Sequence, residues 1–384
     1  MAQRAEAAQF IAPAAFVPAL QALRGLAALA VVIFHADVFL QKVDASVDLP
    51  GVRYGWLGVD LFCVLSAFVL TRMLNGTRRP RYGDFVVDRL LRVLPAYYVA
   101  LAATGLAVLT LDPGSVSVTG FLANLALVQN LDHGWYLALN PTFWTLAVEV
   151  QFYLLLPLLL GALGARPAST RRVLIWALVA VASAMVVRAV GFVREDVVQS
   201  TISLPAFAGH FALGILAARI GSVRRPGWWF VGALPFLLVP PLLWVPESSA
   251  GCGYDTFVGA TFVRPLVAFG CAALVLAAAS PGRLRERLER PVWLWLGRIS
   301  FSLYVIHALV LAQLLEAFPS FGVSAKEHPL VYTAVGTVLS LIAGKALYGV
   351  VEGPAEAWRR RRKRHGQTSP PAAVPARASS VVTP

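Results

Sequence analysis

The chain has 384 residues, of which 58% are hydrophobic and 14% charged, and its formal net charge is +13. Soluble globular domains contain about 45–50% apolar and about 25% charged residues, so this composition excludes an ordinary soluble domain. The positive charge does not indicate nucleic-acid binding, because the basic residues lie in short clusters between apolar runs, without a basic domain interleaved with aromatic residues. The composition predicts an all-α polytopic integral membrane protein.

Apolar runs of about 18–25 residues predict ten membrane spans. Their approximate limits are residues 24–41, 57–74, 93–111, 143–163, 173–193, 201–218, 227–245, 259–279, 293–317 and 329–350. Alternate linkers, counted from segment 1–23, hold 23 Lys and Arg residues, whereas the other linkers hold 4. The positive-inside rule then places both termini in the cytoplasm, in agreement with an even number of spans.

Two parts of this scheme are irregular. The sixth span is interrupted by Pro205 and His210, and segment 112–142 contains VTGFLANLALVQNL, which is short for a span and is expected to be a re-entrant or interfacial helix. We expect a cytoplasmic N-terminal segment at 1–19, a transmembrane domain at 20–356 and a cytoplasmic tail at 357–384. The tail begins with the basic run RRRRKR and is expected to be disordered from residue 367 onward.

The cysteines and the N-terminus exclude several other classes of protein. Cys63 and Cys271 lie in apolar segments and Cys252 in a loop, which indicates neither a disulfide framework nor a metal site. The first 22 residues lack the features of a cleaved signal peptide, so the first apolar run is expected to be a retained anchor. Because nucleotide-binding and zinc motifs are absent, we expect no metal and no tightly bound cofactor.

The first apolar run, LQALRGLAALAVVIFHADVF, carries Arg24 and His35. They are eleven residues apart, which is close to three helical turns, so both side chains lie on one helix face about 16 Å apart along the axis. Ionisable residues within a membrane are costly and commonly functional, although a histidine that only joins two helices is the open alternative.

The next two stretches with unusual polar residues belong to the second and third spans. GVDLFCVLSAF, residues 58–68, places Asp60 and Ser66 at the start of the second span, where Asp60 could also be solvated or cap the helix. DRLLRVLP, residues 88–95, places Arg89 and Arg92 on one helix face, where they could equally be topological anchors.

Two later stretches repeat this pattern. FWTLAVEVQFY, residues 143–153, contains Trp144, Glu149 and Gln151, and a carboxylate at Glu149 is either functional or part of a structural ion pair. LGRISFSLYVIH, residues 296–307, carries a polar stripe at i, i+4 and i+7 that could serve interhelical hydrogen bonding or chemistry. The stripe consists of Ser300, Tyr304 and His307.

Together, these stretches resemble the bacterial membrane acyltransferase-3 family, in its stand-alone form without a fused SGNH domain, over roughly residues 18–356. The resemblance rests on LQALRGLAALAVVIFHA, GVDLFCVLSAFVL, FVVDRLLRVLPAYY, FWTLAVEVQFYLLLPLL and LGRISFSLYVIH, in that order. The chain departs from the family pattern at four positions, which are Cys63, Ala67, Thr145 and Val150.

The resemblance implies a multi-pass enzyme of the bacterial cytoplasmic membrane. It would transfer an acyl group, expected to be acetyl, from acyl-coenzyme A to a hydroxyl of a carbohydrate or other glycosylated acceptor. His35 would act as general base, and Glu149 would orient it or stabilise its imidazolium. Arg24, Arg89 and Arg92 would bind the coenzyme A phosphates. A possible substrate path comprises Asp60, Ser66, Trp144, Gln151, Ser300, Tyr304 and His307.

Other functions stay open at this point. A transporter would use the same polar residues as a pathway for a glycolipid or sugar, without acyl transfer, and a membrane scaffold would use them only to join helices. Within the enzyme reading, a covalent acyl intermediate is compatible with the sequence. The acceptor, the acyl length and the oligomeric state are not specified by these residues.

Overall fold

The computed structural model describes residues 17–47, 49, 51–76, 80–111, 114, 116–136, 138–163, 169–196, 198–243 and 256–368, without the side chains of 241 and 363–368. Most of the predicted N-terminal segment and of the predicted disordered tail lies outside these residues. All regular elements within them are helical. They are α2 (Pro18–Val43), η1 (Val52–Trp56), α3 (Leu57–Leu74), α4 (Tyr82–Leu111), α5 (Val118–Leu125), η2 (Gln129–Leu131), α6 (Trp144–Ala162), α7 (Thr170–Val193), η3 (Val198–Ile202), α8 (Leu204–Ile220), α9 (Pro226–Leu243), η5 (Gly259–Val263), α10 (Arg264–Ala279), α11 (Arg283–Leu288), α12 (Pro291–Ala317), η6 (Phe318–Phe321), α13 (Pro329–Leu347), η7 (Tyr348–Glu352) and α14 (Gly353–Thr368).

The predicted fold class is confirmed. Nine helices in the described part of the chain are long and apolar enough to cross a membrane, and α9 supplies a shorter apolar helix where the seventh span was predicted. Residues 329–362, from α13 through η7 into α14, form one long helix, which carries the chain beyond the predicted last span. The protein is therefore a multi-pass, all-helical membrane protein.

Pro205 marks the beginning of α8 and does not break it, so the irregularity predicted in the sixth span lies just before this helix. The π-helical turn η3 ends at Ile202, and the Ser203 hydroxyl then accepts a hydrogen bond from the Ala206 N–H at 3.3 Å. A serine at the N-cap and a proline in the first turn are both typical of a helix start, where the missing proline N–H has no intrahelical partner to lose. His210 lies on the buried face of the uninterrupted helix.

The apolar stretch in segment 112–142 forms α5, a helix of eight residues that begins at a serine cap. The Tyr97 hydroxyl of α4 donates to the Asn124 carbonyl at 2.6 Å, and the Gln129 amide donates to the Phe143 carbonyl at 2.7 Å, just ahead of α6. This short helix is thus held against α4, the turn η2 that follows it is held at the start of α6, and α5 is far shorter than a span.

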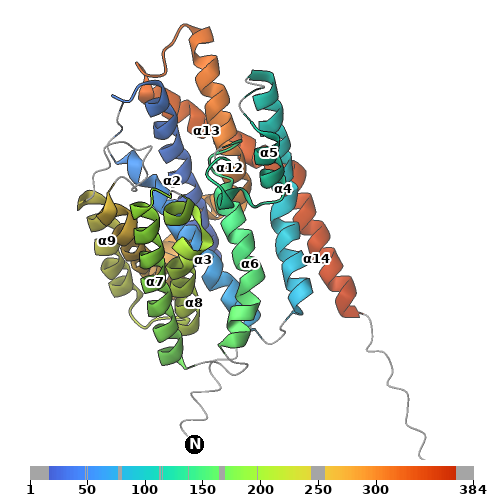
Figure 1. Cartoon of the computed structure of the whole chain (residues 1–384). Helices are drawn as coiled ribbons and strands as arrows, with labels where there is room; N and C mark the ends of the chain where they lie inside the picture. Colours follow the sequence, from blue (N-terminus) through green and yellow to red (C-terminus); the bar gives the residue numbers. More distant parts are fainter. Residues whose placement is uncertain are drawn as a thin grey trace, which may run out of the picture.

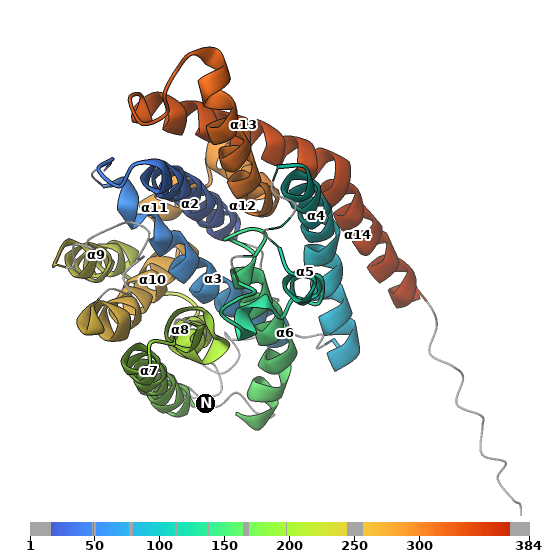
Figure 2. The same cartoon turned by 45° about the horizontal axis from the view of Figure 1, so that its top comes forward.

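Helix α3 lies near the centre of the bundle, with α2, α6, α8 and α10 packed around it (Figures 1 and 2). Helices α4 and α14 lie side by side at one edge of the bundle. The buried apolar residues that join these helices form one large cluster on each side of α3. Polar side chains directed from α2, α4, α6 and α12 toward α3 therefore come together in the interior.

A close crossing in this arrangement joins α2 to α12. A Cβ atom on Gly297 would lie 2.1 Å from the Gln21 carbonyl oxygen, and a Cβ on Gly25 would lie 2.5 Å from the Gly297 nitrogen. Because neither position has room for a side chain, the two backbones can approach to contact distance, as small residues allow in membrane helices. The crossing fixes the relative position of the polar residues on both helices.

Candidate active site

A cavity of about 1150 Å³ lies within the bundle. It is lined by residues of α2, α3, α4, α6, α8, α12, η7 and α14. Along α3 its lining extends from Val59 to Met73, which corresponds to roughly 21 Å of helix rise, and it continues to Gly76 beyond the helix end. Cavities of about 300–1,000 Å³ hold drug-sized ligands, so this space suits a long molecule.

One end of the cavity is strongly cationic. Its lining includes six arginines, Arg24, Arg72, Arg89, Arg92, Arg298 and Arg360, but only two carboxylates, Glu149 and Glu356. Three of these arginines were predicted from the sequence and three were not. A concentration of guanidinium groups over an apolar cavity favours a ligand with several negative charges, phosphates above all.

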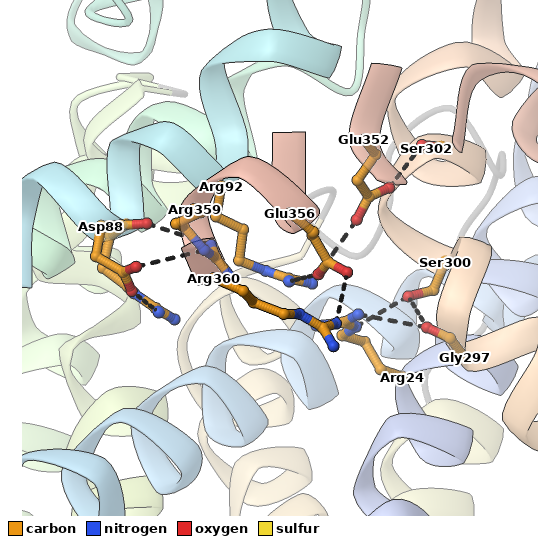
Figure 3. Close-up of polar contacts among 11 residues, drawn as sticks. Arg24, Asp88, Arg92, Gly297, Ser300, Ser302, Glu352, Glu356, Arg359 and Arg360 are labelled. Carbon is orange, nitrogen blue, oxygen red and sulfur yellow. Dashed lines mark hydrogen bonds and ion pairs between the residues drawn. The ribbon is translucent and has the colours of Figure 1, made fainter. Parts of the chain in front are cut away.

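Arg24 is held in place by the crossing of α2 and α12. Its Nε donates to the Ser300 hydroxyl at 2.9 Å and its Nη2 to the Gly297 carbonyl at 3.3 Å (Figure 3). The Ser300 hydroxyl donates in turn to the Gly297 carbonyl at 2.8 Å. The first residue of the predicted polar stripe on α12 therefore positions the predicted arginine of α2.

Arg92 is held by two carboxylates that the sequence analysis missed. Its Nη1 donates to Glu356 at 2.7 Å, and Glu352 lies 3.9 Å from its Nη2 (Figure 3). Glu352 also accepts from the Ser302 hydroxyl at 2.6 Å, and Glu356 accepts from Arg360 at 3.2 Å. The sequence could have indicated both residues, because two carboxylates four residues apart at the end of an apolar run are as unusual as Glu149.

Arg89 lies beside its neighbour Asp88. The same Asp88 carboxylate forms an ion pair with Arg359 of α14 at 3.3 Å, so it joins the start of α4 to the basic run (Figure 3). Helix α14 thus supplies both acidic and basic groups to the cationic end of the cavity. The basic run 359–364 was predicted as a topological anchor. Its first residue, Arg359, belongs to this network of ion pairs.

The middle and deep parts of the cavity carry hydroxyl and carboxylate groups between apolar walls. The Ser66 hydroxyl donates to Glu149 at 2.9 Å, and the hydroxyls of Thr145 and Tyr304 lie 2.8 Å apart. The Tyr304 ring packs edge-on against Phe62, with ring centroids 5.4 Å apart. In addition to the three predicted arginines, four predicted candidates line the cavity: Ser66, Glu149, Ser300 and Tyr304.

His35 and His307 form a pair next to the deep end, although neither belongs to the cavity lining. Nδ1 of His35 lies 3.2 Å from Nε2 of His307, and the Tyr304 and His307 ring centroids are 5.7 Å apart. His307 is completely buried, whereas His35 is half-buried. The structure thus brings His35 to His307 and brings Glu149 to Ser66, two pairings that the sequence could not distinguish.

Asp60 belongs to a separate buried cluster. Its carboxylate is fully buried, accepts from Nε2 of His210 at 2.7 Å and forms an ion pair with Arg264 at 3.1 Å. It does not line the cavity, so the solvated alternative weighed from the sequence is wrong. His210 and Arg264 were not predicted to take part, because their partner lies on a helix far away in the chain.

Two further candidates join helices. Gln151 exchanges hydrogen bonds with the Asn130 side chain at 2.8 and 3.3 Å, which links α6 to η2. The Trp144 ring packs against Phe207 of α8, with centroids 5.7 Å apart. Neither side chain lines the cavity. In the part of the chain that the structure describes, there is also no group of three His, Cys, Asp or Glu side chains suited to a metal ion.

Comparison with known proteins assigns the fold to a family. The family of acyltransferase-3 proteins, described as "Acyltransferase domain", matches residues 17–349 of the chain. The chain belongs to the acyltransferase-3 family. The match covers every helix that lines the cavity except α14, which begins at Gly353. The chain is thus a multi-pass membrane member of this family.

Curated relatives are distant but consistent with this assignment. A Staphylococcus aureus (strain COL) protein provisionally named an O-acetyltransferase is 23% identical over 367 residues, which cover 88% of this chain and 57% of that protein. An Acidianus two-tailed virus protein, provisionally named an acetyltransferase, is 24% identical over 76% of this chain and 83% of its own length. Nodulation protein 10 of Rhizobium leguminosarum bv. viciae is 29% identical over 67% of this chain and 72% of its own.

This chain therefore spans a little over half the length of the staphylococcal relatives. No solved structure shows a significant match.

Proposed function

We propose that the protein is an O-acyltransferase that binds acyl-coenzyme A in the cavity and transfers its acyl group to a hydroxyl of a carbohydrate or glycosylated acceptor. The main support for the proposal is the distribution of side chains along the cavity. Six arginines line one end, and a histidine pair lies beside the other end. The staphylococcal and viral relatives, provisionally named O-acetyltransferase and acetyltransferase, support acetyl as the acyl group.

The dimensions of the cavity fit the donor. Arg24 and His35 are separated by about 16 Å of helix rise. The pantetheine arm of coenzyme A has about twelve bonds from phosphate to sulfur and extends to about 14 Å at the reach of an extended polypeptide backbone. With its phosphates on the arginines, the thioester would lie near Tyr304, next to the histidine pair. The arginines lie at the end of the bundle that the positive-inside rule assigns to the cytoplasm, where acyl-coenzyme A is made.

The residues at the deep end suit proton transfer to and from the reacting groups. His35 would accept the proton of the acceptor hydroxyl as its oxygen attacks the thioester carbonyl. The carbon–sulfur bond then breaks, and the same proton protonates the leaving thiolate to give free coenzyme A. The Tyr304 hydroxyl at this end of the cavity donates to the Thr142 carbonyl at 3.4 Å; it would turn from there to donate to the thioester carbonyl oxygen as negative charge develops on it.

The proposal is tested by acyl transfer in liposomes. We would reconstitute the wild type, His35→Ala and, as a matched control, His328→Ala, because His328 is exposed at the start of α13. Acetyl-coenzyme A labelled in its acetyl group is added with candidate sugar acceptors, and free coenzyme A and labelled acceptor are measured. We expect acceptor-dependent transfer by the wild type and the control and none by His35→Ala. Equal transfer by all three proteins would remove His35 from the reaction.

A further inference from the structure

His307 is a buried imidazole that the proposed reaction does not yet use. It lies on α12, one turn beyond Tyr304, and its Nε2 atom is 3.2 Å from Nδ1 of His35. The two rings are tilted by 56°, with centroids 5.0 Å apart. No acidic side chain forms a hydrogen bond with either ring in the described part of the chain, so each imidazole is the side-chain partner of the other.

The backbone carbonyls fix which nitrogen of each ring carries the proton. A carbonyl oxygen only accepts hydrogen bonds, and Nδ1 of His307 lies 2.7 Å from the Tyr304 carbonyl, so this nitrogen is the donor. Nε2 of neutral His307 is then an acceptor. Nδ1 of His35 lies 2.9 Å from the Val31 carbonyl, so it is also a donor, shared between that carbonyl and Nε2 of His307. The remaining nitrogen of His35, Nε2, must therefore carry a lone pair.

We infer that His307 is the positioning residue of the reaction. It accepts the Nδ1–H of His35 and so keeps the lone pair of His35 on Nε2, the atom that the proposed reaction uses as the base. This inference rests on the proposed function, in which His35 is the general base. It replaces Glu149 in the orienting role, because the Glu149 carboxylate accepts from Ser66 and forms no hydrogen bond with His35.

The proton movements balance around this pair. When the acceptor oxygen attacks the thioester carbonyl, its proton moves to Nε2 of His35, and His35 becomes an imidazolium. The Nδ1–H of that imidazolium stays hydrogen-bonded to Nε2 of His307, which shares the positive charge without taking up the proton. Nε2 then returns its proton to the leaving sulfur, and both rings are again neutral.

A neutral partner suits this site better than a carboxylate. A carboxylate next to His35 would add a buried charge to an apolar region, and an isolated buried charge is costly unless it is paired throughout the cycle. Two neutral imidazoles bury no charge between turnovers. The aromatic ring of Phe34, 5.1 Å from the His35 ring centroid, and the Tyr304 ring enclose the pair with apolar surface.

Two variants of His307 separate positioning from packing. His307→Gln retains a side-chain acceptor for the Nδ1–H of His35, whereas His307→Leu retains only volume. We expect His307→Leu to lower kcat about 100-fold while KM for acetyl-coenzyme A changes less than about threefold, and His307→Gln to restore at least about a tenth of kcat. Equal kcat in His307→Leu and wild type, or equal losses in both variants at full folding, would overturn the inference.

A second readout does not depend on activity. In protein labelled with nitrogen-15 at its six histidines, His35 resonances are assigned from their loss in His35→Gln. We expect a protonated Nδ1 and an unprotonated Nε2 on His35, with a nitrogen–nitrogen coupling to His307 across the hydrogen bond. An unprotonated Nδ1 would overturn the inference. If the wild type shows these signals but neither binds coenzyme A nor transfers acetyl groups, the proposed function fails while the paired geometry stands.

Discussion

Asp60 and Glu149 are both carboxylates in apolar helices, but their neighbours differ. Asp60 is fully buried between His210 and Arg264 and does not line the cavity. Glu149 faces the cavity and accepts from Ser66. A buried carboxylate and its basic partners stabilise a fold only when all of them are present, because the loss of one partner leaves a buried charge without compensation.

We therefore predict that Asp60→Asn destabilises the protein without altering the donor site. Removal of one partner from a buried ion pair costs about 3–5 kcal/mol, so the midpoint of thermal unfolding in detergent should fall clearly. Asp44→Asn is the control, because the Asp44 carboxylate is accessible to solvent. It pairs with Lys326 at 3.8 Å and accepts from Ser46 at 2.6 and 3.0 Å, contacts that an amide oxygen can still accept, so the midpoint should barely change. Coenzyme A affinity of the folded Asp60→Asn protein should match the wild type. An unchanged midpoint would show that the Asp60 cluster does not support the fold.

At the residue scale, the sequence predicted which side chains are unusual, but not their partners. Spacing alone placed Arg24 and His35 on one face, and both contact α12 in the structure. The choice of His307 rather than Glu149 as the partner of His35 depends on how α2, α6 and α12 are arranged, which no local pattern encodes. Ion pairs between distant helices, such as Asp60 with Arg264, escape sequence reasoning for the same reason.

At the scale of helices, the crossing of α2 with α12 positions residues at both ends of the cavity. Arg24 contacts Ser300 and His35 contacts His307, so a displacement of α12 would disturb the donor site and the histidine pair together. Apolar run lengths were sufficient to predict the membrane-spanning helices, with α9 shorter than predicted. The crossing itself depends on two glycines, which occur in many helices that do not meet in this way.

Gly297→Ala tests this crossing. The added methyl group would lie 2.1 Å from the Gln21 carbonyl, and overpacking of this kind costs about 1–3 kcal/mol. We expect a lower thermal midpoint and weaker coenzyme A binding, because Arg24 is carried away from Ser300. Gly232→Ala on α9 is the matched control, since nothing lies within 4 Å of its added carbon and the midpoint should not fall. If both variants behave alike, close contact of α2 and α12 is not required.

At the scale of the whole molecule, helices from both ends of the described chain line an elongated cavity whose two ends differ in chemistry. The arginines come from α2, α3, α4, α12 and α14, so the cationic end is assembled from both ends of the chain. The residues near the deep end come from α2, α3, α6 and α12. An acyl donor with a phosphorylated head and a thioester tail would use both ends at once, which is the central claim of the proposed function.

The most direct measurement of this claim is the equilibrium Kd of coenzyme A and of pantetheine for purified wild type, Arg92→Gln, Arg298→Gln and the control Arg285→Gln. Arg298 lines the cavity but is exposed, so its loss leaves no buried carboxylate unpaired, and Arg285 pairs with Glu289 outside the cavity. A charge-assisted contact to phosphate is worth about 1.5–3 kcal/mol, which corresponds to about tenfold or more in Kd.

We predict that both cavity variants weaken coenzyme A binding by about tenfold, with Arg285→Gln unchanged and the affinity for pantetheine equal in all four proteins. Equal affinity of all four proteins for coenzyme A would contradict the account, because the arginines of the cavity would then not bind the donor.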